Sequence, residues 1–216
     1  MTVDVKICGI KTREALDAAI DGGTKYIGLV FFGKSPRNVD IPTAAELARH
    51  ARGRAKVVAL VVDGDDMALA DIAKIVKPDF FQLHGKETPQ RVTAIKARFG
   101  ISVIKAVAVE TAHDAVAARA YTGTVDLILF DAKAPKGSEL PGGNGLAFDW
   151  TALAGVAKTM DFMLSGGLRP ETVGDAIRLT GTKAVDVSSG VETAPGVKDP
   201  ELIRRFLHAV KTAKQT

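Results

Sequence analysis

The chain has 216 residues, of which 46% are hydrophobic and 25% charged, and this length and composition predict one globular domain with a full core. The net charge is +4, but Lys and Arg are scattered among acids without interleaved aromatics, which argues against nucleic-acid binding and suits a small anionic substrate. A single Cys excludes an internal disulfide framework, and no apolar stretch reaches the roughly 18–20 residues needed to span a membrane.

The chain enters a strand-like segment at once, with no charged-then-apolar leader, so we expect a cytoplasmic protein. Short runs rich in Val, Ile and Phe then alternate with segments of helical period. The predicted strands are Val3–Cys8, Tyr26–Phe32, Lys56–Val62, Phe80–His84, Val103–Val107, Val125–Asp131, Asp161–Ser165 and Ala184–Ser188. The predicted helices lie near Thr12–Asp21, Thr43–Arg52, Met67–Val76, Pro89–Phe99, Ala112–Ala120, Trp150–Ala157, Pro170–Leu179 and Pro200–Lys214.

Eight strand–helix units in 216 residues predict an α/β fold of the (β/α)8 barrel type rather than an open doubly wound sheet. Continuously apolar strands are typical of parallel strands buried on both faces. No composition shift or linker divides residues 1–216, so we expect a single catalytic domain.

Glycine follows the predicted strands at five places, directly after Cys8, Phe32, His84, Ser165 and Ser189. In such a barrel the carboxyl ends of all strands open on one face, and that face carries the site. These residues are therefore expected to form one ring. Two loops on this face, 33–41 and 132–148, are longer than a minimal turn, and loops of that length are typical of lids or binding loops.

Segment 162–192 contains two consecutive strand ends that lead into small, Gly-rich turns. The first holds Gly166 and Gly167, and the second holds Ser188 and Ser189. Clustered backbone N–H groups with little side chain in the way are suited to binding phosphate. Pro170 fits the first turn of the helix expected between them. The alternative is that these are ordinary tight turns that need glycine.

Cys8 and Asp131 are the candidates for proton transfer. Cys8 ends the first strand, and Lys6 lies on the same side of it, so a nearby cation would lower the thiol pKa. Asp131 ends an apolar strand, where it either caps the next segment or is an acid whose pKa burial raises. A thiolate at Cys8 could act as general base or as nucleophile, and the two residues could flank a substrate as base and acid. A free Cys is, however, more commonly a small buried hydrophobe.

Three further residues are candidates for binding the substrate. Arg37 could form a forked contact with a carboxylate or phosphate, or be a solvated loop charge. His84 is either a donor that faces the ligand or a core histidine, and Asp186 either reaches the site or anchors polar contacts within the barrel. The histidines are dispersed and no GxGxxG follows the first strand, so we expect no metal and no cofactor.

Six motifs resemble the phosphoribosylanthranilate isomerases of tryptophan biosynthesis over essentially the whole chain. They are Lys6-Ile7-Cys8-Gly9-Ile10, Ser35-Pro36-Arg37, Gln82-Leu83-His84-Gly85, Gly142-Gly143-Asn144-Gly145 with Phe148-Asp149-Trp150, Ser165-Gly166-Gly167-Leu168, and Asp186-Val187-Ser188-Ser189-Gly190-Val191-Glu192. One departure is Asn144, where the family usually has Thr.

The resemblance implies an Amadori rearrangement of N-(5-phosphoribosyl)anthranilate to 1-(2-carboxyphenylamino)-1-deoxyribulose 5-phosphate. It implies that Asp131 is the general acid that protonates the furanose oxygen and that Cys8 is the general base that removes the C2 proton. It also implies that Arg37 binds the anthranilate carboxylate. The phosphate would be held around Gly166, Gly167, Ser188 and Ser189, which makes a small phosphorylated molecule the expected partner.

Three alternatives stay open at this point. The histidine-pathway isomerase performs the same chemistry, but it would want two phosphate cradles and typically an Asp base. A non-catalytic phosphate-sugar-binding barrel would have no use for Cys8 facing Asp131. A metal-dependent epimerase lacks its ligands in this sequence. The sequence does not decide between a monomer and a homodimer.

Overall fold

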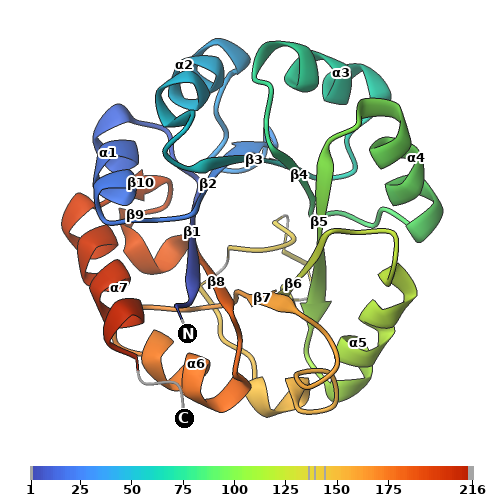
Figure 1. Cartoon of the computed structure of the whole chain (residues 1–216), viewed down its shortest axis with the longest axis vertical. Coiled ribbons are helices and arrows are strands. Elements are labelled where there is room, and N and C mark those ends of the chain that lie inside the picture. The colour runs from blue at the N-terminus through green and yellow to red at the C-terminus, as the bar shows by residue number, and fades with distance from the viewer. Residues whose placement is uncertain (1, 136, 139, 144, 214–216) are drawn as a thin grey trace.

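A closed barrel of parallel strands surrounded by helices organises the chain in the computed structural model, which describes residues 2–135, 137–138, 140–143 and 145–213 (Figure 1). The barrel strands, paired in sequence order, are β1 (Asp4–Cys8), β2 (Tyr26–Phe31), β3 (Lys56–Val61), β4 (Phe80–Leu83), β5 (Ser102–Val109), β6 (Leu127–Ala132), β7 (Phe162–Leu164) and β8 (Ala184–Val187). Strand β8 pairs with β1 and closes the ring. The predicted barrel is confirmed.

The helices are α1 (Arg13–Asp21), α2 (Ile41–Ala51), α3 (Asp66–Ile75), α4 (Pro89–Phe99), α5 (Ala112–Ala117), α6 (Val173–Thr180) and α7 (Pro200–Thr212), with 3-10 turns η1 (Ala118–Tyr121), η2 (Trp150–Leu153) and η3 (Ser189–Val191). Among the described helices, none is both long and apolar enough to cross a membrane. The last predicted helix residue, Lys214, and the family departure at Asn144 lie outside the described residues.

Side chains that accept hydrogen bonds from backbone N–H groups set where most helices begin. Thr12, Asp40, Asp65, Thr88 and Asp199 cap α1, α2, α3, α4 and α7, each by accepting from the first turn. These short polar residues follow apolar strands and precede helical periodicity, which is why the alternation in the sequence was informative.

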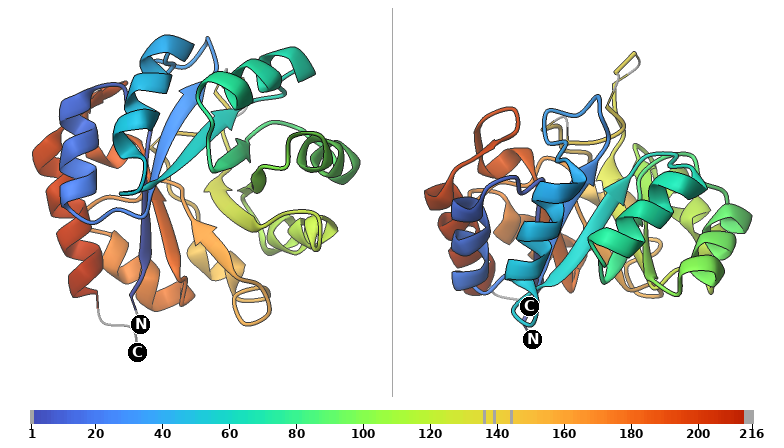
Figure 2. Two further views of the ribbon diagram at one scale, coloured as in Figure 1. Left: turned by 45° about the horizontal axis from the view of Figure 1, so that its top comes forward. Right: turned by 90° about the horizontal axis from the view of Figure 1, so that it is seen from above.

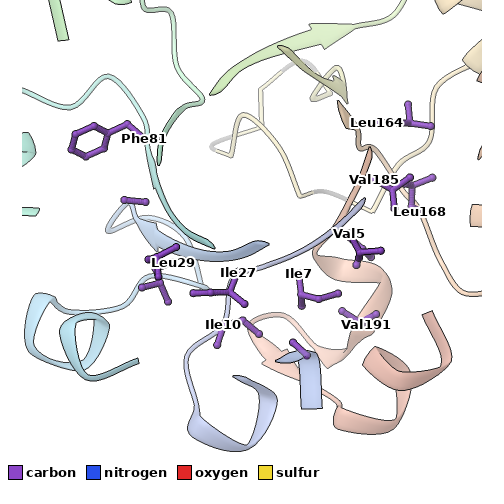
Figure 3. Close-up of a cluster of buried hydrophobic side chains, with 14 of the residues drawn as sticks. Val5, Ile7, Ile10, Ile27, Leu29, Phe81, Leu164, Leu168, Val185 and Val191 are labelled. Carbon is purple, nitrogen blue, oxygen red and sulfur yellow. The ribbon is translucent and has the colours of Figure 1, made fainter. Parts of the chain in front are cut away.

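Alternate residues of each strand divide the core into an outer and an inner layer. The outer layer packs the strands against the helices, and Figure 3 shows Val5, Ile7, Ile27 and Leu29 directed this way. An inner cluster that includes Met163 fills the barrel. The barrel interior is therefore packed, and it leaves room for a ligand only at its end.

Three predicted helices differ from the structure by three residues or more. The one predicted at Ala112–Ala120 ends at Ala117 and continues as η1. The segment near Trp150–Ala157 forms the 3-10 turn η2 and further turns. Most of its backbone bonds join residues three apart, as from Ala154 N to Thr151 O, and Gly155 disfavours helix. Helix α6 begins at Val173 rather than Pro170. Pro170 instead lies second in a turn that Thr172 N closes by donating to Arg169 O, a position that also suits proline.

Several strand ends were also predicted one residue too late. Strands β2, β3, β4, β7 and β8 end one residue before the predicted bounds. A hairpin of β9 (Glu192–Ala194) and β10 (Val197–Lys198) was not predicted at all. It follows η3 and lies between β8 and α7, beside the carboxyl end of the barrel.

The loop after β6 lies over the carboxyl end of the barrel. In Figure 1 its yellow trace crosses the middle of the ring, and in Figure 2 (right) it rises above the end opposite to the one where β1 begins. This is the face on which the sequence places the site.

Candidate active site

A pocket opens at the carboxyl end of the barrel, the face that carries the site in this fold. Cys8, Arg37, His84, Asp131 and Asp186 all lie in its lining. Residues far apart in the sequence meet here because the strands that carry them end at one edge. The structure thus brings together the predicted proton-transfer and substrate-binding residues.

Cys8 lies next to a buried ion pair. Lys6 Nζ donates to Asp186 Oδ1 at 2.8 Å, and the strand register places these two residues side by side on β1 and β8. Gly28 on β2 leaves the space, since a Cβ there would come within 2.9 Å of Cys8 Sγ. Burial lowers the pKa of Lys6, but the charges of Asp186 and Cys8 raise it to about 12.

The expected effect of Lys6 on Cys8 is outweighed in this structure. Burial raises the pKa of the Cys8 thiol above its ordinary value of 9.0, and the Asp186 carboxylate raises it further. The Lys6 cation does lower this pKa, but not enough to reverse the sum. The prediction of a lowered thiol pKa was therefore wrong, because burial of the thiol, together with the Asp186 carboxylate, outweighs the Lys6 cation.

Asp131 and His84 face one another across the pocket. Asp131 Oδ2 lies 3.3 Å from His84 Nε2, and Asp131 Oδ1 accepts a hydrogen bond from the backbone N–H of Ala132 at 2.9 Å. Gly142, in the loop after β6, packs over both side chains, and a Cβ at this position would collide with them. His84 is therefore a pocket residue that contacts Asp131 rather than a histidine of the apolar core.

Arg37 forms a buried ionic cluster with Glu192 and Lys198. Its Nε and Nη2 both donate to the Glu192 carboxylate at 2.8 Å, and Lys198 Nζ donates to the same carboxylate at 2.5 Å. The Nη1 of Arg37 has no hydrogen-bond partner among the described residues and lies beside Gly143 at the pocket wall. The alternative of a solvated loop charge does not hold, since Arg37 is only 6% exposed.

The two Gly-rich turns line a smaller adjoining pocket. Gly166 and Gly167 have φ values of +89° and +64°, which favour glycine. A Cβ at Gly190 would collide with the Leu168 carbonyl, so the turn after β8 packs directly against the turn after β7. Ser189 begins η3 and lies in the pocket lining. The four predicted phosphate-binding residues thus surround one small cavity.

The opposite side of the main pocket is apolar. Val30 and Phe32 from the β2 end and Leu60 and Val62 from the β3 end form this wall. One end of the pocket therefore offers backbone amides and hydroxyls, and the other offers hydrocarbon.

Sequence reasoning missed three residues of this site. Gln82, quoted only as part of a motif, is fully buried and contacts His84, and its spacing of two residues from His84 was the available signal. Glu192 was likewise only quoted within a motif. Lys198 gave no signal, because only the hairpin brings it back to Ser188, whose carbonyl and hydroxyl both accept from Lys198 Nζ. Within the described ranges, no three side chains of His, Cys, Asp or Glu gather as metal ligands would.

Known proteins match the chain over nearly its full length. The family model of N-(5'-phosphoribosyl)anthranilate (PRA) isomerase matches residues 5–209. The N-(5'-phosphoribosyl)anthranilate isomerase of Rhodopseudomonas palustris is 55% identical over 215 residues, which cover 100% of this chain and 99% of the relative.

Solved structures agree. The phosphoribosyl anthranilate isomerase of Thermotoga maritima superposes with a TM-score of 0.88 at 35% identity, covering 97% of this chain and 99% of that one. A phosphoribosyl anthranilate isomerase in complex with reduced 1-(o-carboxyphenylamino)-1-deoxyribulose 5-phosphate superposes with a TM-score of 0.85 at 33% identity, and it covers 97% of this chain and 99% of that one. The chain belongs to the N-(5'-phosphoribosyl)anthranilate isomerase family.

Proposed function

We propose that the chain catalyses the Amadori rearrangement of N-(5-phosphoribosyl)anthranilate in tryptophan biosynthesis, with Cys8 as general base and Asp131 as general acid. The observation that carries this proposal is a single pocket lined by both side chains, with a glycine-rich cavity adjoining one end and an apolar wall at the other. Family membership supports the overall reaction, and the pocket supports the assignment of roles.

Asp131 performs the first step. Its protonated carboxyl delivers a proton to the furanose oxygen, the C1–O bond breaks, and the nitrogen lone pair forms the C1=N bond of a Schiff base. His84, which faces Asp131 Oδ2 at 3.3 Å, orients the carboxyl and contacts the substrate beside it. Ring opening creates the acidic C–H that the base then removes.

Cys8 performs the second step as a thiolate. It removes the C2 proton, the electron pair moves toward the nitrogen to give an enolamine, and tautomerisation yields the C2 ketone. Because burial and Asp186 raise the pKa of Cys8, the thiolate is a minor species near neutral pH. The Lys6 cation lowers this pKa and so limits the rise. Activity is therefore expected to rise with pH until the thiol is ionised.

The remaining contacts hold the two anionic ends of the substrate. Arg37 offers its Nη1 to the anthranilate carboxylate while Glu192 holds the other side of the guanidinium. The aromatic ring lies against the wall that includes Phe32 and Leu60. The phosphate binds at the two Gly-rich turns, and Asp186 contacts the sugar from the barrel centre.

A turnover assay on freshly generated phosphoribosylanthranilate tests the proposal. Fluorescence of the substrate is followed with and without a chelator, and its loss is compared with spontaneous hydrolysis. Cys8→Ser and Asp131→Asn are each expected to lose about 10²–10⁴-fold in kcat, the usual contribution of a general acid or base. Both variants should still bind the reduced product analogue. The matched control is Asp161→Asn. Asp161 is an exposed aspartate of the same barrel that pairs with Lys183 on the surface, so this variant should retain activity.

Wild-type-like rates in Cys8→Ser would remove the thiol from the mechanism. If the wild-type protein is folded by circular dichroism but does not accelerate substrate loss, the proposed activity is wrong. The histidine-pathway substrate is then the next to be assayed, and failure there too would leave a phosphate-sugar-binding barrel.

A further inference from the structure

Gln82 has an unusual place in the pocket, because it is fully buried yet half of its amide has no partner. Its side chain comes from β4 and lines the pocket beside His84. Nε2 lies 3.0 Å from His84 Nδ1, whereas Oε1 has no hydrogen-bond partner among the described residues. Leaving a buried acceptor unpaired is unfavourable, so such an atom calls for an explanation.

The contact between Gln82 and His84 decides which ring nitrogen carries the proton. An amide nitrogen can only donate, so a hydrogen bond from Gln82 Nε2 to this ring needs the lone pair of Nδ1 as its acceptor. The proton of the neutral ring is then on Nε2, the nitrogen that faces Asp131 Oδ2 at 3.3 Å. In this tautomer the nitrogen nearest to Asp131 already carries a proton, so it cannot take one from the acid.

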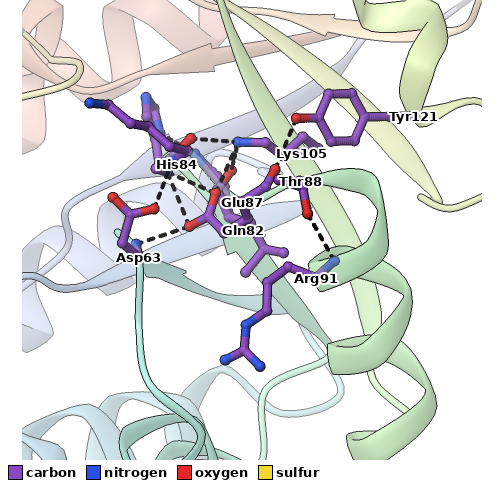
Figure 4. A network of polar contacts seen from close by, with 11 residues as sticks. Asp63, Gln82, His84, Glu87, Thr88, Arg91, Lys105 and Tyr121 are labelled. Atoms are coloured by element: carbon purple, nitrogen blue, oxygen red, sulfur yellow. Dashed lines mark hydrogen bonds and ion pairs between the residues drawn. The ribbon is translucent and has the colours of Figure 1, made fainter.

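A buried network holds the chain around His84 in place (Figure 4). Lys105 Nζ donates to the carbonyls of Leu83 and Gly85, at 3.1 and 2.8 Å, and to Glu87 Oε2 at 3.0 Å. These acceptors lie on both sides of His84 in sequence, and they use all three ammonium protons. The imidazole therefore starts from a fixed backbone, and the orientation of the Gln82 amide decides its tautomer.

We propose that Gln82 has two roles in the reaction: its Nε2 positions His84 as the Nε2–H tautomer, and its Oε1 accepts a hydrogen bond from an N–H or O–H of the sugar–amine part of the substrate. The first role concerns the free protein. The second rests on the proposed function, because it assigns the unpaired oxygen to a donor that only the bound substrate brings into the pocket.

Two variants separate these roles from simple packing. Gln82→Glu keeps the size and an acceptor but replaces the N–H donor, so it requires a proton on Nδ1. Gln82→Met keeps the length and removes both polar atoms. Gln90→Glu on the exposed side of α4 is the matched control. Circular dichroism and thermal unfolding establish that each variant is folded.

The tautomer is read by long-range ¹⁵N–¹H correlation on ¹⁵N-histidine-labelled protein without ligand, with the His84 signals assigned from a His84→Asn variant. The wild type is expected to have a bare Nδ1 and a protonated Nε2, and Gln82→Glu to gain a proton on Nδ1. A protonated Nδ1 in the wild type would mean that the amide is turned round, and this would overturn the positioning role whether or not the protein is an isomerase.

Turnover and binding test the second role. A histidine held in the wrong tautomer lowers kcat by as much as about 10⁴-fold in other enzymes, and we expect a loss of at least about 10²-fold in Gln82→Glu. Gln82→Met should bind the reduced product analogue about tenfold more weakly, the worth of one hydrogen bond. It should bind inorganic phosphate, which stays in the adjoining cavity, as the wild type does. Equal losses for both ligands, or no loss for either, would contradict a contact between Oε1 and the sugar–amine part.

Discussion

Replacing Glu192 by Gln tests whether the buried ionic cluster beside the pocket stabilises the fold. Glu192 is the only carboxylate among the described residues that contacts both Arg37 and Lys198, and the side chains of all three are at most 7% exposed. The variant keeps the shape of the side chain and removes its charge. Two cations are then left close together in a buried site without a counter-charge.

The expected loss in the free energy of unfolding is large. Removing one partner of a buried ion pair costs about 3–5 kcal/mol, because the remaining charge stays desolvated. In a domain of this length each kcal/mol corresponds to about 2–4 °C in Tm, so the transition should fall by about 6–20 °C. Glu171→Gln is the matched control, because Glu171 pairs with Arg205 on the surface at 2.7 Å, and exposed pairs contribute about 0–1 kcal/mol.

A double-mutant cycle identifies the source of the loss. Urea unfolding is measured for Glu192→Gln, Lys198→Met and both together. If the loss of stability comes from an uncompensated ammonium at Lys198, Glu192→Gln should destabilise the protein by at least about 1.5 kcal/mol less in the Lys198→Met background. That difference lies within the usual range of interaction energies between residues in contact. Equal costs in both backgrounds, or a loss no larger than that of Glu171→Gln, would refute this reasoning.

The pH dependence gives an independent check with a defined sign. Burial raises the pKa of Glu192, but the Arg37 and Lys198 contacts outweigh it and hold the pKa below 4.5. The ionised carboxylate therefore stabilises the fold fully above pH 4.5, and this contribution is lost as the pH falls toward the folded pKa. Burial already lowers the pKa of Lys198 below 10.5, so in Glu192→Gln the stability deficit should shrink as the pH rises and Lys198 releases its proton.

Three further predictions concern other parts of the chain. The rate of alkylation of Cys8, the only thiol in the chain, should keep rising through and beyond pH 9, because the pKa of this thiol is raised in the folded protein. Mass spectrometry after labelling at stepped pH measures this rate, and a rate that levelled off below pH 8 would contradict the prediction. Gly190→Ala should weaken phosphate binding at least tenfold or unfold the protein, since its Cβ would collide with the Leu168 carbonyl. Calorimetry measures the binding, and Gly155→Ala is the control variant because a Cβ there meets nothing within 4 Å. Phe206→Ala should destabilise by about 3–5 kcal/mol in urea unfolding because Phe206 is fully buried in α7, and a loss below 1 kcal/mol would contradict this.

The barrel was predictable because its determinants are local. Each strand is a run of apolar residues, and most helices are preceded by a capping residue such as Asp65 or Thr88. Pro170 shows where local rules stop, since proline fits both the first turn of a helix and the second position of a turn, and only the hydrogen bond from Thr172 N to Arg169 O distinguishes them. The residues at the pocket were likewise predictable, because strand ends in a barrel share one face.

The electrostatics of the site were not predictable from the sequence in the same way. Lys6 is two residues from Cys8, and that spacing alone predicted a lowered thiol pKa. Asp186, the carboxylate that forms an ion pair with Lys6, lies 180 residues away and is adjacent only through the β1–β8 register. The sign of a pKa shift depends on burial and on every charge nearby, and none of these is a property of local sequence.

The arrangement of these charges has a consequence for how the site can work. Lys6 and Lys198 both lower the pKa of Cys8, but each is held by a carboxylate, Asp186 in one case and Glu192 in the other. Removing one partner of such a group is costly, but replacing all of its members by apolar residues can be neutral or stabilising, so stability alone does not explain why the charges are present. Both cations are held by short contacts, Lys6 by Asp186 at 2.8 Å and Lys198 by Glu192 at 2.5 Å. The two cations that lower the thiol pKa are therefore held in place by carboxylates of the protein itself.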